Sequence, residues 1–166
     1  MEPSEHLKTS GVRKSLAEAL ILSKLNYCNV VYGQLPQYML KRLQRVQTCT
    51  AGYVFRRYAT INDIFSLKWL PIIEFIEFST VKLVHRAIYA ENWPAYLKLE
   101  TVHYSRITRL SQDGIRLKCG ESRTFQDQAK VFNFLPKSVR EESCFGKFVS
   151  EAKQFYRDKA KARLSL

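Results

Sequence analysis

The segment Glu18–Gln47 constrains the fold most, because its apolar residues recur at helical spacing on both sides of a single corner. Residues 33–36 read Gly-Gln-Leu-Pro, which joins a helix stop signal to a proline that suits the first turn of a following helix. The first helix is expected to end near Tyr32, and the second is expected to cover residues 37–56. The pattern therefore predicts a pair of amphipathic helices.

Each of the two expected helices has an apolar side that should be buried. In the first helix, which Ser10 or Ser15 would cap, this side consists of Leu16, Ala19, Leu20, Ile21, Leu25 and Val31. In the second helix it consists of Leu40, Leu43, Val46, Thr50 and Val54. Tyr27 and Cys28 are assigned to the packing of the first helix.

Helical periodicity continues downstream. Asn62 is expected to cap a short helix that ends before Trp69-Leu70-Pro71, a structural corner in which the indole fills a core and the proline fixes the turn. Further helices are expected over residues 72–91, 124–134 and 143–161, and a short turn or helix over 95–99. Pro136 should stop the helix that ends near Phe134.

The segment around Gly114 differs from the rest, because residues 115–119 alternate apolar and polar side chains as a short strand does. Residues 105–110 are its expected partner, with Gln112-Asp113-Gly114 as the turn. We therefore expect a mainly α fold, a bundle-like domain of five to seven helices with one small β-hairpin.

The expected organisation has five parts. They are a frayed or disordered lead (1–12), a helical region (13–100), a basic hairpin region (101–123), C-terminal helices (124–162) and a frayed tail (163–166).

Charge of one sign marks the first half of the chain. No Asp or Glu occurs between Glu18 and Asp63, whereas that span carries Lys24, Lys41, Arg42, Arg45, Arg56 and Arg57. The whole chain has a formal net charge of +12. A basic face backed by an apolar stripe suits a polyanion such as nucleic acid. A solvated face that aids solubility is the alternative for Lys41, Arg42 and Arg45.

Two further groups of residues allow two interpretations each. The aromatic residues that alternate with Arg56 and Arg57 could stack on bases, although core packing is favoured for Tyr53, Phe55 and Tyr58. The hairpin cations could contact nucleic acid or could protect an edge strand from aggregation; they are Arg106, Arg109, Arg116 and Lys118.

Catalytic signatures are missing from the sequence. The aspartates Asp63, Asp113, Asp127 and Asp158 are never adjacent, so the clustered carboxylates of a polymerase or nuclease are absent. There is no Gly-rich phosphate loop, and His6, His85 and His103 lack zinc-ligand spacing. His85 is interpreted as a surface or half-buried helix residue. The chain alone is expected to be inactive, without a metal, cofactor or small-molecule substrate.

The cysteines Cys28, Cys49, Cys119 and Cys144 form no C-x-x-C pair, which disfavours a zinc ribbon. They are expected to be free, buried or half-buried thiols in a reducing compartment. The polar start of the chain lacks a secretory signal, and its apolar runs are too short to span a bilayer. We therefore expect an intracellular protein without a membrane partner, in the cytoplasm or the nucleus.

Three blocks of the sequence carry a family resemblance. The first is ALILSKLNYCN (19–29), which continues through GQLP (33–36) into LKRLQRVQ (40–47). The second is LKWLP (67–71), followed by a helix that ends in VHRA (84–87), and the third is FNFLP (132–136), followed by FGKF (145–148). In order and spacing they resemble the region after the polymerase core in jockey-like, non-LTR (LINE-type) retrotransposon reverse transcriptases.

The resemblance covers about residues 13–160 and shows two departures. Asn26 stands where that family usually has Asp, and Phe132 stands where Trp is common before Asn133. Both changes preserve the expected helical and packing roles. Asn133 and Pro136 are accordingly assigned structural roles.

The resemblance implies that this chain is a fragment, similar to the thumb and post-thumb helices that grip a template–primer duplex. RNA or an RNA–DNA duplex, and an upstream polymerase core, are the implied partners; catalytic carboxylates and Mg²⁺ would belong to that missing core. Two other interpretations stay open. One is a helical protein-interaction module that docks on a polymerase core or a host protein, and the other is a transposon relic without function.

Overall fold

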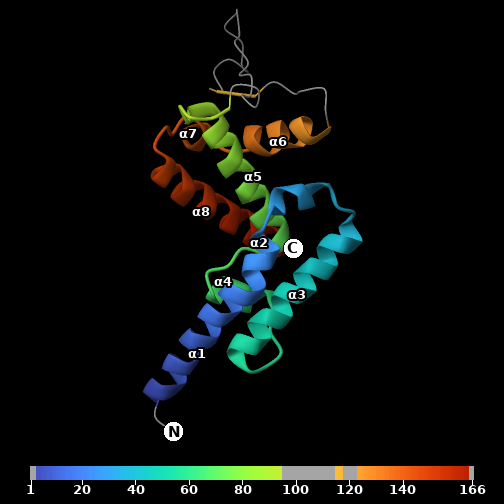
Figure 1. Cartoon of the computed structure of the whole chain (residues 1–166), viewed down its shortest axis with the longest axis vertical. Coiled ribbons are helices and arrows are strands. Elements are labelled where there is room, and N and C mark those ends of the chain that lie inside the picture. The colour runs from blue at the N-terminus through green and yellow to red at the C-terminus, as the bar shows by residue number, and fades with distance from the viewer. Residues whose placement is uncertain (1–2, 95–114, 118–122, 165–166) are drawn as a thin grey trace, which may run out of the picture. The chain divides into compact units, whose positions relative to one another are not determined.

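The computed structural model describes residues 3–94, 115–117 and 123–164, and this part of the chain is mainly α-helical (Figure 1). The fold-class prediction is therefore confirmed. The chain divides into two compact units, Met1–Ile76 and Glu77–Leu166. Each unit is described below by itself.

The first unit consists of short and long helices in series. They are α1 (Pro3–Ala17), the π-helical turn η1 (Glu18–Leu22), α2 (Ser23–Asn26), the 3₁₀ helix η2 (Asn29–Gln34), α3 (Gln37–Phe55) and α4 (Ile61–Ser66). In Figure 1, α1 and α3 run side by side in opposite directions. The expected second helix thus ends one residue from its expected end.

The first helix differs from the expectation in its start, its end and its buried side. It begins at Pro3 and is interrupted by η1. The buried residues are Arg13, Ala17 and Leu22, whereas Leu16 and Leu20 are 46% and 62% exposed. A π turn has a wider repeat than an α-helix, and here it brings Ala17 and Leu22, five residues apart, to the buried side. The expected stripe at α-helical spacing was therefore wrong.

The packing role assigned to Tyr27 and Cys28 was also wrong. Tyr27 is 75% exposed, and the Cys28 thiol is exposed. Tyr27 has an extended backbone, and Cys28 has a left-handed one with φ of 50°. These two residues end α2 before the 3₁₀ helix begins, so their side chains leave the helical surface on which the packing role depended. Val31, expected on the buried stripe, is exposed as well.

The core of the first unit lies between α1, α3 and α4. Its buried members are Ala17, Ala51, Val54, Ile64 and Leu67, with Phe55, Ala59, Ile61 and Trp69 packed against them. The buried Arg13 guanidinium donates a 3.2 Å hydrogen bond to the carbonyl oxygen of Val54. The last carbonyls of a helix lack intrahelical partners, so Arg13 completes the end of α3 from a neighbouring helix.

The end of α3 requires a glycine. Arg56 adopts a left-handed conformation with φ of 56° and closes the helix. The chain then turns back so closely that a Cβ on Gly52 would meet the carbonyl oxygen of Arg57 at 2.9 Å. Gly52 therefore permits the reversal that leads the chain from α3 toward α4.

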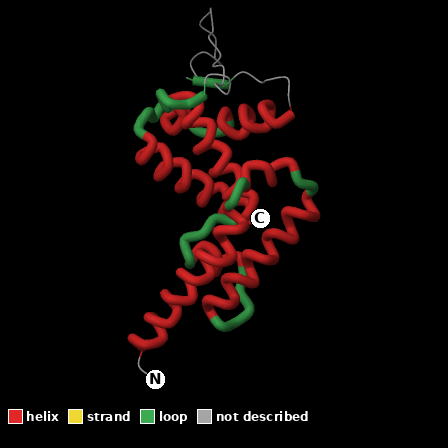
Figure 2. The backbone as a smooth tube through the Cα atoms, in the orientation of Figure 1, coloured by secondary structure: helices red, strands yellow, loops and turns green. Residues whose placement is uncertain are grey.

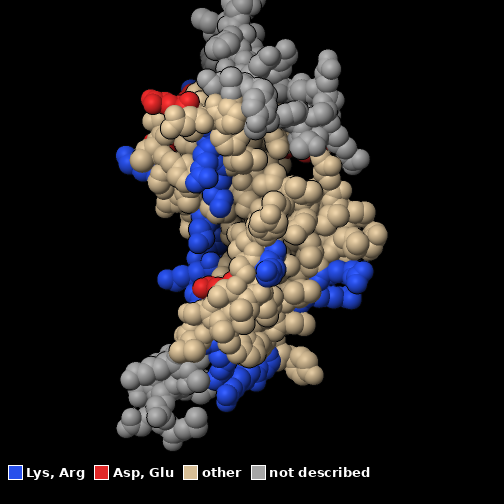
Figure 3. Space-filling model, in the orientation of Figure 1, with Lys and Arg blue, Asp and Glu red and all other residues tan. Residues whose placement is uncertain are grey.

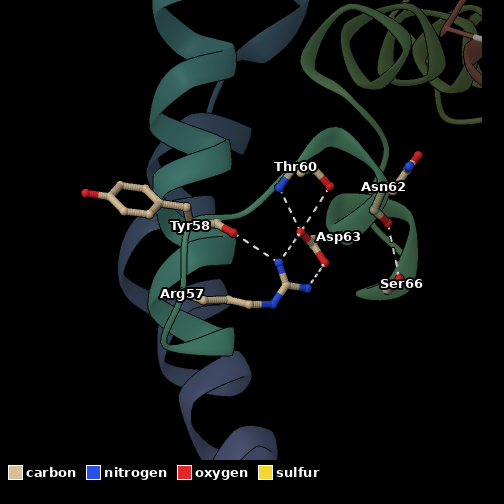
Figure 4. A network of polar contacts seen from close by, with 6 residues as sticks. All are labelled: Arg57, Tyr58, Thr60, Asn62, Asp63 and Ser66. Atoms are coloured by element: carbon tan, nitrogen blue, oxygen red, sulfur yellow. Dashed lines mark hydrogen bonds and ion pairs between the residues drawn. The ribbon is translucent and has the colours of Figure 1, made fainter.

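Helix α4 begins with a capping box (Figure 4). Thr60, rather than Asn62, is the N-cap residue. The Asp63 carboxylate accepts hydrogen bonds from the backbone N–H of Thr60 at 2.7 Å and from its hydroxyl at 3.1 Å. Asn62 lies inside the helix, where its carbonyl accepts a hydrogen bond from the Ser66 hydroxyl. An acidic residue three positions after Thr suits this role, because it satisfies an amide that the helix leaves unpaired.

Trp69-Leu70-Pro71 forms the structural corner that the sequence predicts. Trp69 packs against the core of the first unit, and its indole Nε1 donates a 2.7 Å hydrogen bond to Glu18. Pro71 is buried. On the side of α3, Gln47 donates to the carbonyl of Leu70 at 2.8 Å, and Gln44 accepts from the amide of Ile72 at 2.9 Å. The first and second sequence blocks therefore meet through these two glutamines.

The second unit contains most of α5 (Ile72–Tyr89) and all of α6 (Arg123–Asn133), α7 (Lys137–Arg140) and α8 (Phe145–Leu164). Its buried residues include Val81, Val84, Phe132, Phe148, Ala152 and Tyr156. Phe148, Ala152 and Tyr156 recur at four-residue steps and so form one buried face of α8. Pro136 lies directly before α7 as its N-cap residue.

Helices α5 and α8 pack in antiparallel register. At one end of the pair, Glu77 forms an ion pair with Lys159, and the rings of Phe78 and Tyr156 have centroids 6.4 Å apart. At the other end, the rings of His85 and Phe148 have centroids 4.1 Å apart, and the Arg86 guanidinium is 4.6 Å from the centre of the Phe145 ring. Each step toward the end of α5 thus matches a step toward the start of α8. His85 is 2% exposed and packs among aromatic rings, which is more complete burial than the sequence suggested.

Asn133 holds a short extended segment against α6. Its side-chain amide accepts a hydrogen bond from the amide of Leu117 at 2.9 Å and donates one to the carbonyl of the same residue at 3.1 Å. Arg140 donates a 2.7 Å hydrogen bond to the carbonyl of Ile115. Leu117 makes an isolated β-bridge, and the described residues include no strand (Figure 2). The rest of the expected hairpin lies outside the described residues.

Candidate nucleic-acid interface

The exposed side of α3 carries the predicted basic residues. Lys41, Arg42 and Arg45 are all exposed, and Arg45 lies about one helical turn beyond both Lys41 and Arg42, so the three share one face of the helix. No acidic side chain in the described part of the chain forms an ion pair with any of them. In the space-filling view of Figure 3, Lys and Arg outnumber Asp and Glu on the face shown.

Two tyrosines extend this face, and we call Tyr38, Lys41, Arg42, Arg45 and Tyr53 the α3 basic face. Tyr38 is 62% exposed and precedes Lys41 and Arg42 by about one turn. Tyr53 is 48% exposed and follows Arg42 by eleven residues, which is close to three turns of helix. Sequence reasoning had missed Tyr38.

The preference for core packing was wrong for two of the three aromatic residues near Arg56. Tyr53 is on the exposed side of α3, and Tyr58 is 101% exposed beyond its end. Only Phe55 is half-buried and packs against the core of the first unit. The exposed rings are free to contact a planar partner, in the way that aromatic side chains stack on unpaired bases.

Arg57 makes its contacts within the chain. Its guanidinium binds both carboxylate oxygens of Asp63 and donates a 3.0 Å hydrogen bond to the carbonyl of Tyr58 (Figure 4). Hydrogen bonds from Arg57 and from the Thr60 amide hold the pKa of Asp63 below its ordinary value. The local geometry thus gives Arg57 a structural role, while Arg56 is exposed at the end of the helix.

Most of the predicted hairpin cations are outside the part of the chain that the structure describes. Arg106, Arg109 and Lys118 lie outside the described residues. Arg116 is described and is half-buried in the segment that Asn133 and Arg140 hold. Of the two nucleic-acid surfaces expected from the sequence, the one on α3 lies within the described residues, and most of the hairpin surface lies outside them.

A second group of cations, which the sequence did not single out, lies on α5 and α8. It consists of Lys82, Arg86 and Lys153, in which the charges of Arg86 and Lys153 act on Lys82. Lys82 and Arg86 are one turn apart on α5, a signal visible in the sequence. The approach of Lys153 depends on the packing of α8 against α5, which no local pattern reveals.

Within residues 3–94, 115–117 and 123–164, no three His, Cys, Asp or Glu side chains gather in a group that could hold a metal ion. Cys28, Cys49 and Cys144 are free thiols and are exposed, not buried as expected. Cys49 is on α3, within one turn of Arg45 and of Tyr53.

None of the helices in the described part of the chain has the length together with the apolar composition that a membrane span requires. No family model matches the chain, and neither a curated protein nor a solved structure matches it. The functional argument that follows therefore depends on the residues of this chain.

Proposed function

We propose that this chain is a non-catalytic nucleic-acid-binding fragment of a retrotransposon reverse transcriptase, and that it binds RNA or an RNA–DNA duplex through the α3 basic face. The observation that carries the binding proposal is an exposed helical face with three cations, two aromatic rings and no acidic partner among the described residues. The three sequence blocks support the family assignment. Two of those blocks also contact each other, because Gln44 and Gln47 bind the backbone at the Trp69 corner.

The chemistry of this face suits phosphates rather than base edges. Lys and Arg side chains on one face neutralise backbone phosphates in a manner independent of sequence, and they release counterions when they bind. The logarithm of the affinity should fall with the logarithm of the salt concentration by about 0.7–0.9 for each phosphate contacted. Three contacts at Lys41, Arg42 and Arg45 would therefore contribute a slope of about 2–3.

The test is fluorescence anisotropy with a labelled RNA–DNA duplex over a salt series. The variant Lys41→Ala/Arg42→Ala/Arg45→Ala should bind more weakly and should lose about 2–3 from the slope. A matched control removes the same charge at three separate exposed lysines, Lys24→Ala/Lys147→Ala/Lys161→Ala. Equal losses in both variants would show that only net charge matters and would overturn the assignment to α3.

Cys49 offers a second test of the same location. Cysteine-to-serine replacements leave a chain with Cys49 alone or Cys28 alone, each carrying a photo-activated cross-linker on its exposed thiol. Cross-links to bound RNA should form from Cys49, because it lies about one turn from Arg45 and from Tyr53 on α3, and should be few from Cys28. The reverse yield would place the nucleic acid elsewhere.

A protein-interaction module is the second candidate, and one observation favours it. Val12, Leu16 and Leu20 are exposed at four-residue steps and are 67%, 46% and 62% accessible. Exposed apolar side chains of this kind commonly mark surfaces that another protein covers. If they do so here, Leu16→Glu/Leu20→Glu should abolish co-purification with an upstream polymerase core while RNA affinity stays unchanged; retained co-purification would reject this candidate.

A further inference from the structure

The register of α5 and α8 brings three cations together. Phe78 lies opposite Tyr156 and Arg86 lies opposite Phe145, so Lys82, midway along this part of α5, faces the region of α8 that contains Lys153. Lys82 and Arg86 share one face of α5 because they are four residues apart. We call Lys82, Arg86 and Lys153 the α5/α8 cation site.

Aromatic rings lie beneath two of these cations. The Lys82 ammonium is 4.6 Å from the centre of the Phe78 ring, and the Arg86 guanidinium is 4.6 Å from the centre of the Phe145 ring. Contacts of this kind hold a cation over the negative face of a ring but do not neutralise it. Phe78 is buried and Phe145 is half-buried, so each ring supports its cation from the core side; Arg86 is exposed, and Lys82 is half-buried.

Arg86 and Lys153 both repel the Lys82 ammonium in the folded chain. No acidic side chain among the described residues forms an ion pair with Lys82, Arg86 or Lys153. Burial, followed by the charges of Arg86 and Lys153, lowers the pKa of Lys82 below its ordinary value. Like charges held close together raise the free energy of the folded state, and a bound anion would relieve that cost.

We propose that the α5/α8 cation site binds a backbone phosphate of nucleic acid, as a second contact on the unit that lacks the α3 basic face. The proposal rests on the proposed function for its choice of a nucleic acid. A phosphate oxygen pair can accept two hydrogen bonds from the Arg86 guanidinium, and the ammonium groups act as point charges beside it. Phe78 and Phe145 lie under the cations rather than beyond them, which favours a polyanion over insertion into a lipid surface.

The first experiment measures thermal unfolding of the full chain with inorganic phosphate and with chloride at equal ionic strength. Phosphate should raise the unfolding midpoint of the wild-type chain, because a ligand that binds the folded state stabilises it. In Lys82→Met/Lys153→Met the rise should be lost, whereas Lys147→Met/Lys161→Met, the charge-matched control, should keep it. A rise that persists in the first variant, or that is missing in the wild type, would overturn the proposal.

The second experiment measures anisotropy with a labelled single-stranded RNA for the wild type, for Arg86→Ala/Lys153→Ala and for the α3 triple alanine variant. The α5/α8 variant should lower the salt slope by about 1–2 in addition to the loss from α3. If the wild type binds no RNA, the proposed function fails; if RNA binding is present but the α5/α8 variant leaves it unchanged, this inference alone fails. Binding to anionic vesicles that depends on Arg86 and Lys153, without RNA binding, would replace nucleic acid with a membrane surface.

Discussion

The side-chain amide of Gln47 donates a 2.8 Å hydrogen bond to the carbonyl oxygen of Leu70, joining α3 to the corner that follows α4. Gln47 is 3% exposed, and its own oxygen accepts a 2.9 Å hydrogen bond from Gln44. Gln44 in turn accepts from the amide of Ile72. A chain of two side chains therefore satisfies backbone groups on both sides of Pro71, which itself has no N–H to donate.

Replacing Gln47 with leucine should destabilise the chain by about 1–3 kcal/mol, because the carbonyl of Leu70 would stay buried without its partner. Urea unfolding followed by circular dichroism measures this change in free energy. Gln154→Leu is the control, because Gln154 is exposed and, among the described residues, bonds only with Asp158 in the next turn. Equal stability of the two variants would argue that Gln47 does not hold the corner.

The capping box at α4 makes Asp63 important for the first unit. Asp63→Ala should destabilise the chain by about 1.5–3 kcal/mol, since charge-assisted hydrogen bonds to Arg57 and to Thr60 are lost. The pKa of Asp63 is lowered in the folded chain, so its contribution is present above the ordinary value of 3.8 and disappears as the pH falls through the lowered value. Stability of the variant should therefore depend less on pH in that acidic range.

The comparison for Asp63 is Asp158→Ala on α8. Asp158 is exposed, and within the part of the chain that the structure describes it accepts hydrogen bonds only from Gln154. Its removal should change the free energy of unfolding by no more than about 0.5 kcal/mol. A loss at Asp158 as large as that at Asp63 would mean that the capping box contributes little of its own.

His85 should make the chain less stable in mild acid. Burial lowers the pKa of His85 in the folded chain below its ordinary value of 6.5, although the hydrogen bond to the Glu142 carbonyl and the Glu142 charge oppose this. The unfolded chain then binds a proton more readily, so stability should fall as the pH drops below about 6.5. Because the carbonyl can only accept, Nε2 carries the proton of the neutral ring at 2.8 Å from it.

The variant His85→Gln tests this dependence, because glutamine offers a donor but does not titrate near neutral pH. Thermal unfolding of both proteins between pH 7.5 and pH 5 should show a smaller decline in the variant. An identical decline in the two proteins would assign the acid sensitivity to another group.

Two glycines should respond to alanine with opposite signs. Gly11 is inside α1 with no atom near the position of an added Cβ, so Gly11→Ala should stabilise the chain by about 0.5–1 kcal/mol. At Gly52 the added Cβ would meet the Arg57 carbonyl oxygen at 2.9 Å, so Gly52→Ala should destabilise it. Thermal unfolding of both variants checks the pair, and stabilisation at Gly52 would show that the turn after α3 can relax.

The fold was predictable where the α-helical repeat of apolar residues continued without interruption. Helix α3 ends within a residue of its expected end, and Val81, Val84 and Ala87, which recur at three-residue steps on α5, are all buried. The chain around Leu20 was not predictable, because a single π turn changes which residues face the core. The identities of the residues from Glu18 to Leu22 do not predict that wider turn.

The candidate interface likewise has residues that the sequence could predict and contacts that it could not. Lys41, Arg42 and Arg45 could be placed on one face because a helix fixes their spacing. The engagement of Arg57 with Asp63 depends on a reversal of the backbone after Gly52, and the approach of Lys153 to Lys82 depends on how two distant helices align. Pairings of that kind are tertiary, so local sequence patterns could not reveal them.

The antiparallel pairing of α5 with α8 has a consequence for synthesis on the ribosome. Phe78 and His85 emerge long before Tyr156 and Phe148, which cover them in the finished protein. At about 5–20 residues added per second, α5 waits several seconds for its partner, while the first unit can already close around Ala51 and Ile64. During that interval the apolar face of α5 is uncovered on the nascent chain, and this is the stage at which a chaperone could bind it.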